Sequence, residues 1–433
     1  MTPTTTGLIG VAALFILIFL RIPVGFVMAA VGFIGFGCVV SFDASMSMIV
    51  KDFFSVFGSY NLTVIPLFVL MGQLAYHSGI SKRLFNAAYK IIGHWPGGLA
   101  IATVGACATF AAVCGSTNAT AATMGAAALP EMKRYDYKPE LATGVVAASG
   151  SLGILIPPSV IFIVYGILTE QSIGRLFMAG LFPGLILSLL FILTIAIWTC
   201  VRPELGPKGP KASLREKLAS LSGLIETAIL FVLIMGGLFC GFFTPTEAGA
   251  IGACGTLLLA LTGRNLTMKG FITSLSDTTR ISCMILVIVA GATIFGHFLA
   301  VTRIPFDIAR WVSEIQLPRY VVMLIIVTVY LIGGCIIDSL ALIMLTIPIF
   351  HPVVLFLGYD PIWFGVIIVL VTQIGVITPP VGINVYVVSG VARDVPLGVI
   401  FKGVFPFLAA LIAGTLLLIA FPQIALFLPG LMG

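Results

Sequence analysis

The sequence predicts an all-α, polytopic membrane protein made of two inverted repeats, each with about five crossings, a re-entrant helical hairpin and a broken helix. Its composition gives the first indication: of 433 residues, 60% are hydrophobic and 9% are charged, whereas soluble domains carry roughly 25% charged residues. Two further indications are the placement of the few charged residues and the repetition of short sequence segments between the two halves. No water-soluble fold hides so much apolar surface with so little polar cover.

The charged residues predict the topology, because basic residues in short loops favour the cytoplasmic side of a membrane. At about 20 residues per crossing, the chain can form on the order of ten spans. The uncharged N-terminus is expected outside, and the first apolar run ends inside at Arg21. Each half makes an odd number of crossings, so the uncharged end at Gly433 also falls outside.

Re-entrant hairpins are predicted at 97–131 and 319–352. The first segment is apolar, yet Lys90 precedes it and Lys133 follows it, so both flanks are expected inside. A single crossing cannot return to its own side, whereas a hairpin can. The proposed tip, CGSTNATAATMG (114–125), is rich in hydroxyl and amide groups and unlike a lipid-facing helix.

The second half repeats the first in order. GLIGVAALFILI (7–18) aligns with GLIETAILFVLI (223–234), and GILIPP (153–158) aligns with GVITPP (375–380). Because each half crosses an odd number of times, the second copy is inserted upside down, an arrangement typical of secondary transporters. We therefore divide the chain into a first repeat (1–201), a basic cytoplasmic linker (202–220) and a second repeat (221–433).

Broken helices are predicted at about 140–166 and 361–389. Pro157-Pro158 and Pro379-Pro380 remove backbone donors and disfavour helical geometry in the residue before them. The freed carbonyls cost several kcal/mol each if they face lipid, so they must be buried in protein or bind a ligand. Two symmetric breaks opposite two polar tips favour a binding site over a structural kink.

The residue types near the tips and breaks suit a small hard cation and an anion. Hydroxyl and carbonyl oxygens are ligands of hard cations, and the N–H groups at half-helix N-termini suit a carboxylate. The candidates in the first half are Ser116, Thr117, Asn118 and Thr120, with Ser149, Ser151 and Gly153 opposite; those in the second are Gly334, Asp338 and Ser339, with Thr372, Gln373, Gly375, Thr378 and Asn384 opposite.

Asp338 is an acid inside an otherwise apolar hairpin. An Asp at a helix centre costs roughly 2.5–3.5 kcal/mol on insertion scales, so it is expected to face protein or water and to have a partner. It is interpreted as a cation ligand or a proton-sensitive coupling residue. The alternative is a carboxylate bonded to the backbone of its own hairpin.

Other classes of protein receive less support. An intramembrane enzyme is disfavoured because the sequence has no HExxH, no Walker-type GxxxxGK[ST] and no second intramembrane Asp to pair with Asp338. We assign no catalytic residue, no cofactor and no metal other than the coupling cation. The net charge of +6 is spread over short loops, so nucleic-acid binding is not expected.

Six motifs make the chain resemble the large membrane subunit (M subunit) of TRAP transporters, the tripartite ATP-independent periplasmic carriers. They are IPLFVLMG (65–72), CGSTNATAATMGAAALPEM (114–132), GSLGILIPPS (150–159), TPTEAGAIGA (244–253), GGCIIDSLALIMLTIPIFHPV (333–353) and TQIGVITPPVGIN (372–384). They occur in order across both halves. They are specific to the family but not to a substrate.

The resemblance implies an elevator-type symporter of a bacterial inner membrane, which couples two or more sodium ions to uptake of an organic acid anion. Its partners would be a small membrane subunit (Q type), as a separate polypeptide, and a periplasmic substrate-binding protein (P type). Both termini would be periplasmic. The resemblance does not identify the solute, which could be a C4-dicarboxylate, a sialic acid or another organic acid. A stand-alone sodium- or proton-coupled anion carrier of the same superfamily is the alternative.

The resemblance also implies where ions bind. Carried onto this chain, sodium site 1 comprises Ser116, Asn118 and Gly153, to which we add Thr120 and Pro157; sodium site 2 comprises Gly334, Asp338, Gly375 and Thr378. The solute is expected between the two sites, against Thr117, Ser151, Ser159, Gln373, Pro380 and Asn384.

Overall fold

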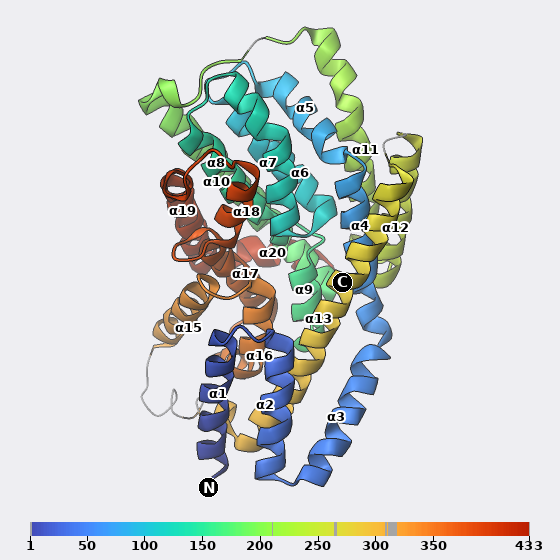
Figure 1. The fold of residues 1–433 in the computed structure, drawn as a ribbon, viewed down its shortest axis with the longest axis vertical. Coiled ribbons are helices and arrows are strands. Elements are labelled where there is room, and N and C mark those ends of the chain that lie inside the picture. The colour runs from blue at the N-terminus through green and yellow to red at the C-terminus, as the bar shows by residue number, and fades with distance from the viewer. Residues whose placement is uncertain (1, 210, 264–265, 308–309, 311–317, 433) are drawn as a thin grey trace.

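The protein is an elongated bundle of helices (Figure 1). The computed structural model describes residues 2–209, 211–263, 266–307, 310 and 318–432. Every regular element within these ranges is a helix and none is a strand, which confirms the predicted all-α architecture.

The first half contains two hairpin arms and a broken helix after five N-terminal helices. The elements are α1 (Pro3–Phe19), α2 (Val24–Val39), α3 (Phe42–Phe57), the 3-10 turn η1 (Tyr60–Thr63), α4 (Val64–His77), α5 (Ile80–Ile92), α6 (Gly98–Cys114), α7 (Thr117–Arg134), α8 (Pro139–Gly150), the 3-10 turn η2 (Ser151–Ile154), α9 (Val160–Leu168) and α10 (Ile173–Val201).

The second half has the same order of hairpin arms and broken helix. It comprises the 3-10 turn η3 (Pro203–Leu205), α11 (Leu214–Phe239), α12 (Pro245–Thr262), α13 (Met268–Thr302), α15 (Arg319–Gly334), α16 (Ser339–Phe356), α17 (Pro361–Ile377), α18 (Ile383–Val391), α19 (Leu397–Ala420) and α20 (Gln423–Leu431). Helix α11 begins inside the segment 202–220 that was predicted as a linker. A capping box starts it, in which Ser213 and Glu216 bond each other's backbone N–H.

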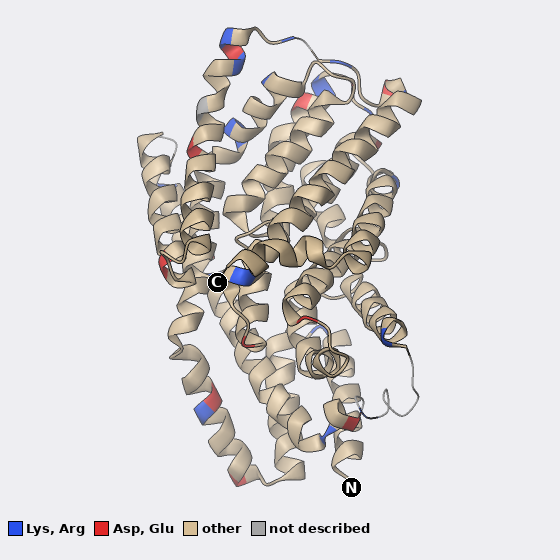
Figure 2. Ribbon diagram, turned by 180° about the vertical axis from the view of Figure 1, so that it is seen from behind, with Lys and Arg blue, Asp and Glu red and all other residues tan. Residues whose placement is uncertain are grey.

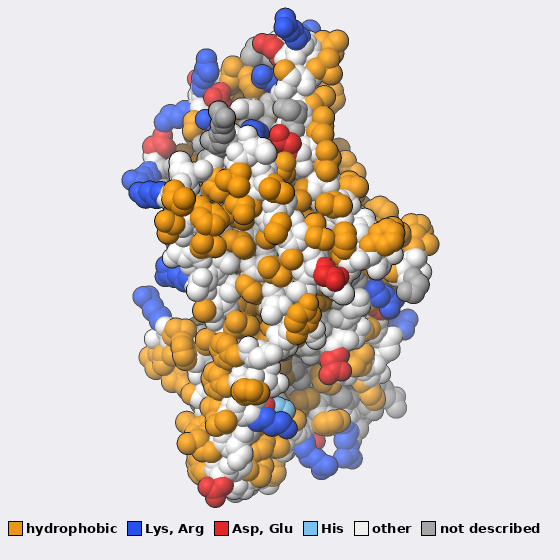
Figure 3. Space-filling view, turned by 90° about the vertical axis from the view of Figure 1, so that its right-hand side faces the viewer, with side chains coloured by type: hydrophobic (Ala, Val, Ile, Leu, Met, Phe, Trp, Pro, Cys, Tyr) orange, Lys and Arg blue, Asp and Glu red, His pale blue; other side chains and the backbone are white. Residues whose placement is uncertain are grey.

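Helix lengths and surface composition fit a membrane protein. Five described helices, α10, α11, α13, α16 and α19, are long and apolar enough to cross a membrane singly, and α3 with η1–α4 forms a sixth candidate bent by 49°. The other apolar helices have 10–17 residues, at most about 26 Å at 1.5 Å per residue. Few charged residues lie in the middle of the bundle (Figure 2), and hydrophobic side chains cover much of the face in Figure 3.

Both Pro-Pro pairs interrupt a helix, as predicted. Pro157-Pro158 lies between η2 and α9, and Pro379-Pro380 lies between α17 and α18; both Pro-Pro peptide bonds are cis. A hydroxyl satisfies one carbonyl at each break: Ser159 Oγ donates to the Ile154 oxygen at 2.6 Å, and Thr378 Oγ1 donates to the Ile374 oxygen at 2.6 Å. The hydroxyls thus reduce the cost of the lost helical bonds.

We distinguish two groups of helices. We call α6–α9 together with α15–α18 the hairpin core, and α2–α4 together with α11–α13 the flanking helices. Within the hairpin core the halves interlock, since α18 packs on α7 and α8 and α16 packs on α9. Among the flanking helices, α2 packs on α13 and α4 packs on α12.

Close packing of α2 on α13 depends on glycine. A Cβ added at Gly32 would lie 2.8 Å from the backbone nitrogen of Phe295, which cannot move independently of its helix. Small residues allow such backbone approach between membrane helices. Gly236 in α11, by contrast, has no atom within 4 Å of an added Cβ.

We predict that Gly32→Ala destabilises the protein by about 1–3 kcal/mol, the usual range for overpacking. The matched control Gly236→Ala adds the same methyl group in open space and is expected to be neutral or stabilising by up to about 1 kcal/mol, because Ala favours helix. Thermal unfolding of both variants in detergent measures the difference. Equal melting temperatures would show that the α2–α13 contact tolerates a side chain.

Candidate functional site

The first hairpin tip lies directly on the first broken helix. A Cβ at Gly153 would be 2.6 Å from the Ser116 carbonyl oxygen and 2.9 Å from Thr120 Oγ1. Gly115 has a φ of +62°, and a Cβ added to it would lie 2.8 Å from the carbonyl oxygen of Pro158. Three backbone segments therefore meet where only glycine fits, and their carbonyl oxygens are brought close together.

The second tip repeats this contact. Gly375 in α17 packs against the backbone of Gly334, where an added Cβ would lie 2.6 Å from the Gly334 Cα. On the other side of this contact, the nearest atoms to a Cβ at Gly334 include the Thr372 carbonyl oxygen at 3.6 Å. Each hairpin thus meets the broken helix that follows it in the chain, through a glycine on the broken helix.

Each return arm of a hairpin begins with a capped N-terminus. Ser116 Oγ accepts a hydrogen bond from the Ala119 N–H at the start of α7, and Asp338 Oδ2 accepts one from the Leu340 N–H, at 3.1 Å, at the start of α16. A carboxylate bonded to its own hairpin backbone is the alternative role for Asp338 that the sequence suggested, and this bond is present. It uses only one carboxylate oxygen, and the Asp338 side chain also lines a cavity.

The two tips share this cavity, which we call the tip cavity. It has a volume of about 300 Å³. Ser116, Thr117 and Asn118 contribute one wall and Asp338 and Ser339 another. Ile154, Val160 and Ile161 come from the first broken helix, and Val69, Ile281, Met284 and Ile285 close the cavity from α4 and α13. Asp338 is the one ionisable carboxylate on this wall, and no Lys, Arg or His is among the described lining residues.

The structure distributes the predicted site residues over three places. Ser116, Thr117, Asn118 and Asp338 line the tip cavity. Thr120, Gly153, Gly334 and Gly375 form the contacts between tips and breaks, with Thr120 Oγ1 donating to the Ser116 oxygen at 2.7 Å. Pro157, Ser159, Thr378 and Pro380 lie in the breaks themselves.

The three remaining predicted solute residues are buried away from the tip cavity wall. Ser151 Oγ donates to the Ala148 oxygen at 2.7 Å. Asn384 Nδ2 donates to the Ala147 oxygen at 3.1 Å, which ties α18 to α8, while its Oδ1 has no partner. Gln373 is fully buried and neither polar atom of its amide has a hydrogen-bond partner in the described part of the chain. Buried polar atoms without partners indicate a site for water or a ligand.

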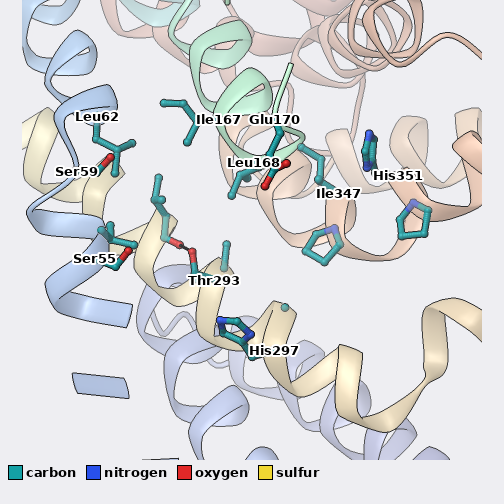
Figure 4. A pocket seen from close by; sticks show the side chains of 16 residues that line it. Ser55, Ser59, Leu62, Ile167, Leu168, Glu170, Thr293, His297, Ile347 and His351 are labelled. Carbon is teal, nitrogen blue, oxygen red and sulfur yellow. Dashed lines mark hydrogen bonds between the residues drawn. The ribbon is translucent and has the colours of Figure 1, made fainter. Parts of the chain in front are cut away.

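Two larger cavities lie where the hairpin core borders neighbouring helices. The inner cavity, about 540 Å³, lies between α7 and the α4–α5 region, with His77, Lys82 and Glu131 on its walls. The outer cavity, about 580 Å³, lies between α3–η1, the end of α9, α13 and α16. Figure 4 shows His297 of α13 and His351 of α16 on different walls of the outer cavity.

Sequence reasoning did not identify the wall that α13 and α4 contribute to the tip cavity. Val69, Ile281, Met284 and Ile285 are apolar residues in apolar helices, so no local signal distinguishes them from core residues.

Comparison with known proteins agrees with this architecture. A family model described as "Tripartite ATP-independent periplasmic transporter, DctM component" matches residues 11–424. The chain belongs to this family. It is therefore a multi-pass membrane subunit of a TRAP transporter, as the sequence motifs indicated, and not an enzyme.

Curated relatives include the C4-dicarboxylate TRAP transporter large permease protein DctM of Pseudomonas aeruginosa, 39% identical over 90% of this chain and 91% of the relative. The sialic acid TRAP transporter large permease protein SiaM of Vibrio cholerae is 35% identical over 96% of both chains. Among solved structures, the Alcanivorax borkumensis YdaH transporter has a similar fold, with a TM-score of 0.66, 15% identity, and coverage of 89% of this chain and 90% of that one.

An ion pair joins the two halves of the hairpin core outside the membrane-spanning segments. Lys133 at the end of α7 bonds Asp394 in the loop after α18, and this bond lowers the pKa of the Asp394 carboxyl below its usual value. A lowered folded-state pKa contributes stability that is present above the pKa of the unfolded chain and is lost as the pH falls through the folded-state pKa.

We therefore predict that Asp394→Asn lowers the melting temperature slightly at pH 7. The effect is small because both side chains are exposed, and it decreases with added salt. Thermal unfolding at pH 7 and below pH ~4, where an ordinary Asp is protonated, checks the sign. A difference that persists unchanged at the lower pH would show that the ion pair is not its source.

Proposed function

We propose that this TRAP permease subunit couples the inward movement of sodium ions to uptake of an organic acid anion. The observation that carries the proposal is the charge of the tip cavity. A carboxylate solute there would meet Asp338 and no basic side chain among the described lining residues. An anion next to a carboxylate is repelled unless a cation binds as well. Sodium bound at the tips would supply that charge, so solute and ion would bind together.

The oxygen-rich contacts between tips and breaks support a hard cation such as sodium over a transition metal. At site 1 the glycine contact concentrates the Ser116 carbonyl and the Thr120 hydroxyl. At site 2, Gly375 and Gly334 meet and Asp338 keeps a carboxylate oxygen near the tip. Neutral and anionic oxygens are the ligands of hard cations. The described residues contain no group of three His, Cys, Asp or Glu suited to a transition metal.

The N-termini of the return arms would hold the solute. Helices α7 and α16 both start at the tip cavity, where the helix dipole and the first-turn N–H groups not bonded by the Ser116 and Asp338 caps would favour an anion. Thr117 and Asn118 add donors on the same wall. The tip cavity of about 300 Å³ is of the size that suits a small organic acid.

An elevator movement would carry this site across the membrane. The hairpin core interlocks internally, and cavities of about 540 and 580 Å³ lie between it and parts of α3, α4, α5 and α13, although α5 also packs directly on α6 and α7. We propose that the hairpin core slides along these helices as a unit. The sodium sites and the solute between them would then face the periplasm and the cytoplasm in turn.

The partners follow from the tripartite family and from the names of the large permease relatives. We propose a small membrane subunit that braces the flanking helices and a periplasmic binding protein that delivers the solute. Both termini would then be periplasmic, in a bacterial inner membrane. Uptake by this chain alone in liposomes would instead favour a stand-alone carrier.

We predict that Asp338→Asn reduces the sodium dependence of uptake and raises the sodium concentration needed for half-maximal uptake at least tenfold, which is about 1.4 kcal/mol. The assay measures accumulation of radiolabelled succinate or sialic acid at several sodium concentrations in cells with the complete transporter. Asp43→Asn, in an exposed turn at the start of α3, is the matched control. Wild-type sodium dependence in Asp338→Asn would remove this residue from the cation site.

A further inference from the structure

The flanking helix α4 meets the first hairpin tip at a glycine. A Cβ added to Gly72 would lie 2.6 Å from the Cys114 carbonyl oxygen and 3.3 Å from the Cys114 Cα. Gly72 belongs to α4, and Cys114 is the last residue of α6, so the contact joins the flanking helices to the hairpin core. Both sides of it are backbone, which cannot yield unless a helix moves. Small residues allow such close approach between membrane helices.

The second hairpin has a looser contact with the flanking helices. Gly296 of α13 faces Pro348 of α16 across the outer cavity, and the nearest Pro348 atoms lie 4.0 Å from an added Cβ. Among the described glycines of the flanking helices, Gly72 alone brings an added Cβ within 3.0 Å of a backbone atom of the hairpin core. The hairpin core thus lies tightly against α4 and loosely against α13 in these places.

The Gly72 contact lies between two cavities along α4. Val69, one turn before it, lines the tip cavity, and Tyr76, one turn after it, lines the inner cavity. Residues three and four apart share one face of a helix. Cys114 itself lines the tip cavity, and the two cavities have no described lining residue in common. One face of α4 therefore passes from the tip cavity to the inner cavity across this contact.

Helix α12 holds α4 in place. An added Cβ would lie 3.1 Å from Leu67 Cβ at Gly249 and 2.5 Å from Met71 Sδ at Gly252, so α12 packs closely on α4. These glycines belong to the motif TPTEAGAIGA (244–253), and the α4 residues belong to IPLFVLMG (65–72). The two motifs thus pack on each other within the flanking helices, and Gly72 at the end of the second one meets the hairpin core.

We propose that Gly72 is a positioning residue that closes the tip cavity toward the inner cavity. In the position of the hairpin core described above, α4 lies against the Cys114 carbonyl and separates the two cavities. When the core moves, this contact breaks and the solute can pass between them. The inference rests on the proposed function and adds to it the place at which the solute site is closed.

The test is Gly72→Ala in the full chain, in cells with the complete transporter. Access to Cys114 is measured as its rate of modification by N-ethylmaleimide, followed by mass spectrometry of the peptide. We expect this rate to rise about tenfold, because an added methyl group overpacks the closed contact and disfavours it. The steady-state accumulation of radiolabelled succinate or sialic acid, whichever probe is transported, should fall about tenfold as solute leaks back.

Gly105→Ala is the matched control. Gly105 lies in the same hairpin arm, α6, and an added Cβ there has no atom within 4 Å. This variant should keep the wild-type rate of Cys114 modification and the wild-type accumulation.

The response of the melting temperature to sodium distinguishes opening of the contact from damage to the tip. We expect this response to persist in Gly72→Ala, because the contact of Ser116 with Gly153 lies within the hairpin core. Its loss in this variant, or a variant that does not fold, would contradict the inference, since the Gly72 contact would then be a fixed part of the tip or of the fold.

Unchanged modification of Cys114, or increased modification with unchanged accumulation, would overturn the role of Gly72 and leave the proposed function standing. A wild-type chain that accumulates neither probe in a sodium-dependent way would instead contradict the proposed function. The modification of Cys114 would still show whether the Gly72 contact opens.

Discussion

The structure depends on a backbone-to-backbone contact that occurs twice, between a hairpin tip and a broken helix. Gly153 lies against Ser116 and Gly375 lies against Gly334, so no side chain separates the two backbones. Apolar packing could bring these segments together, but it could not leave carbonyl and hydroxyl oxygens facing one another inside a membrane. A broken helix must have its freed groups satisfied, and the tips provide the setting in which a cation can do so.

The rest of the architecture positions these contacts. The Pro-Pro pairs end the helices at the level of the tips, and the hydroxyls of Ser159 and Thr378 bond carbonyls at the breaks. Contacts of α18 with α7 and α8 join the halves into one hairpin core. The apolar wall of α13 then completes the tip cavity from outside that core. The tip cavity thus forms between two groups of helices, which is the arrangement that the proposed elevator movement requires.

Features with a strong local cause could be predicted from the sequence. The helix breaks follow from Pro157-Pro158 and Pro379-Pro380, and the all-α class follows from composition. Positions set by packing could not be predicted in the same way. Ser151 has the chemistry of a solute ligand, yet its hydroxyl bonds its own helix, because a buried Ser can reach a backbone carbonyl one turn back. The apolar wall residues of α13 carry no local signal at all.

The central claim is that the folded chain contains sodium sites, and thermal unfolding of the purified protein in detergent tests it most directly. Melting temperatures are compared in sodium chloride and in choline chloride at equal ionic strength. A ligand at about 100 times its dissociation constant that binds only the folded state adds roughly 2.7 kcal/mol. The account predicts a melting temperature that rises with sodium and saturates. Identical unfolding in the two salts at every concentration would contradict it.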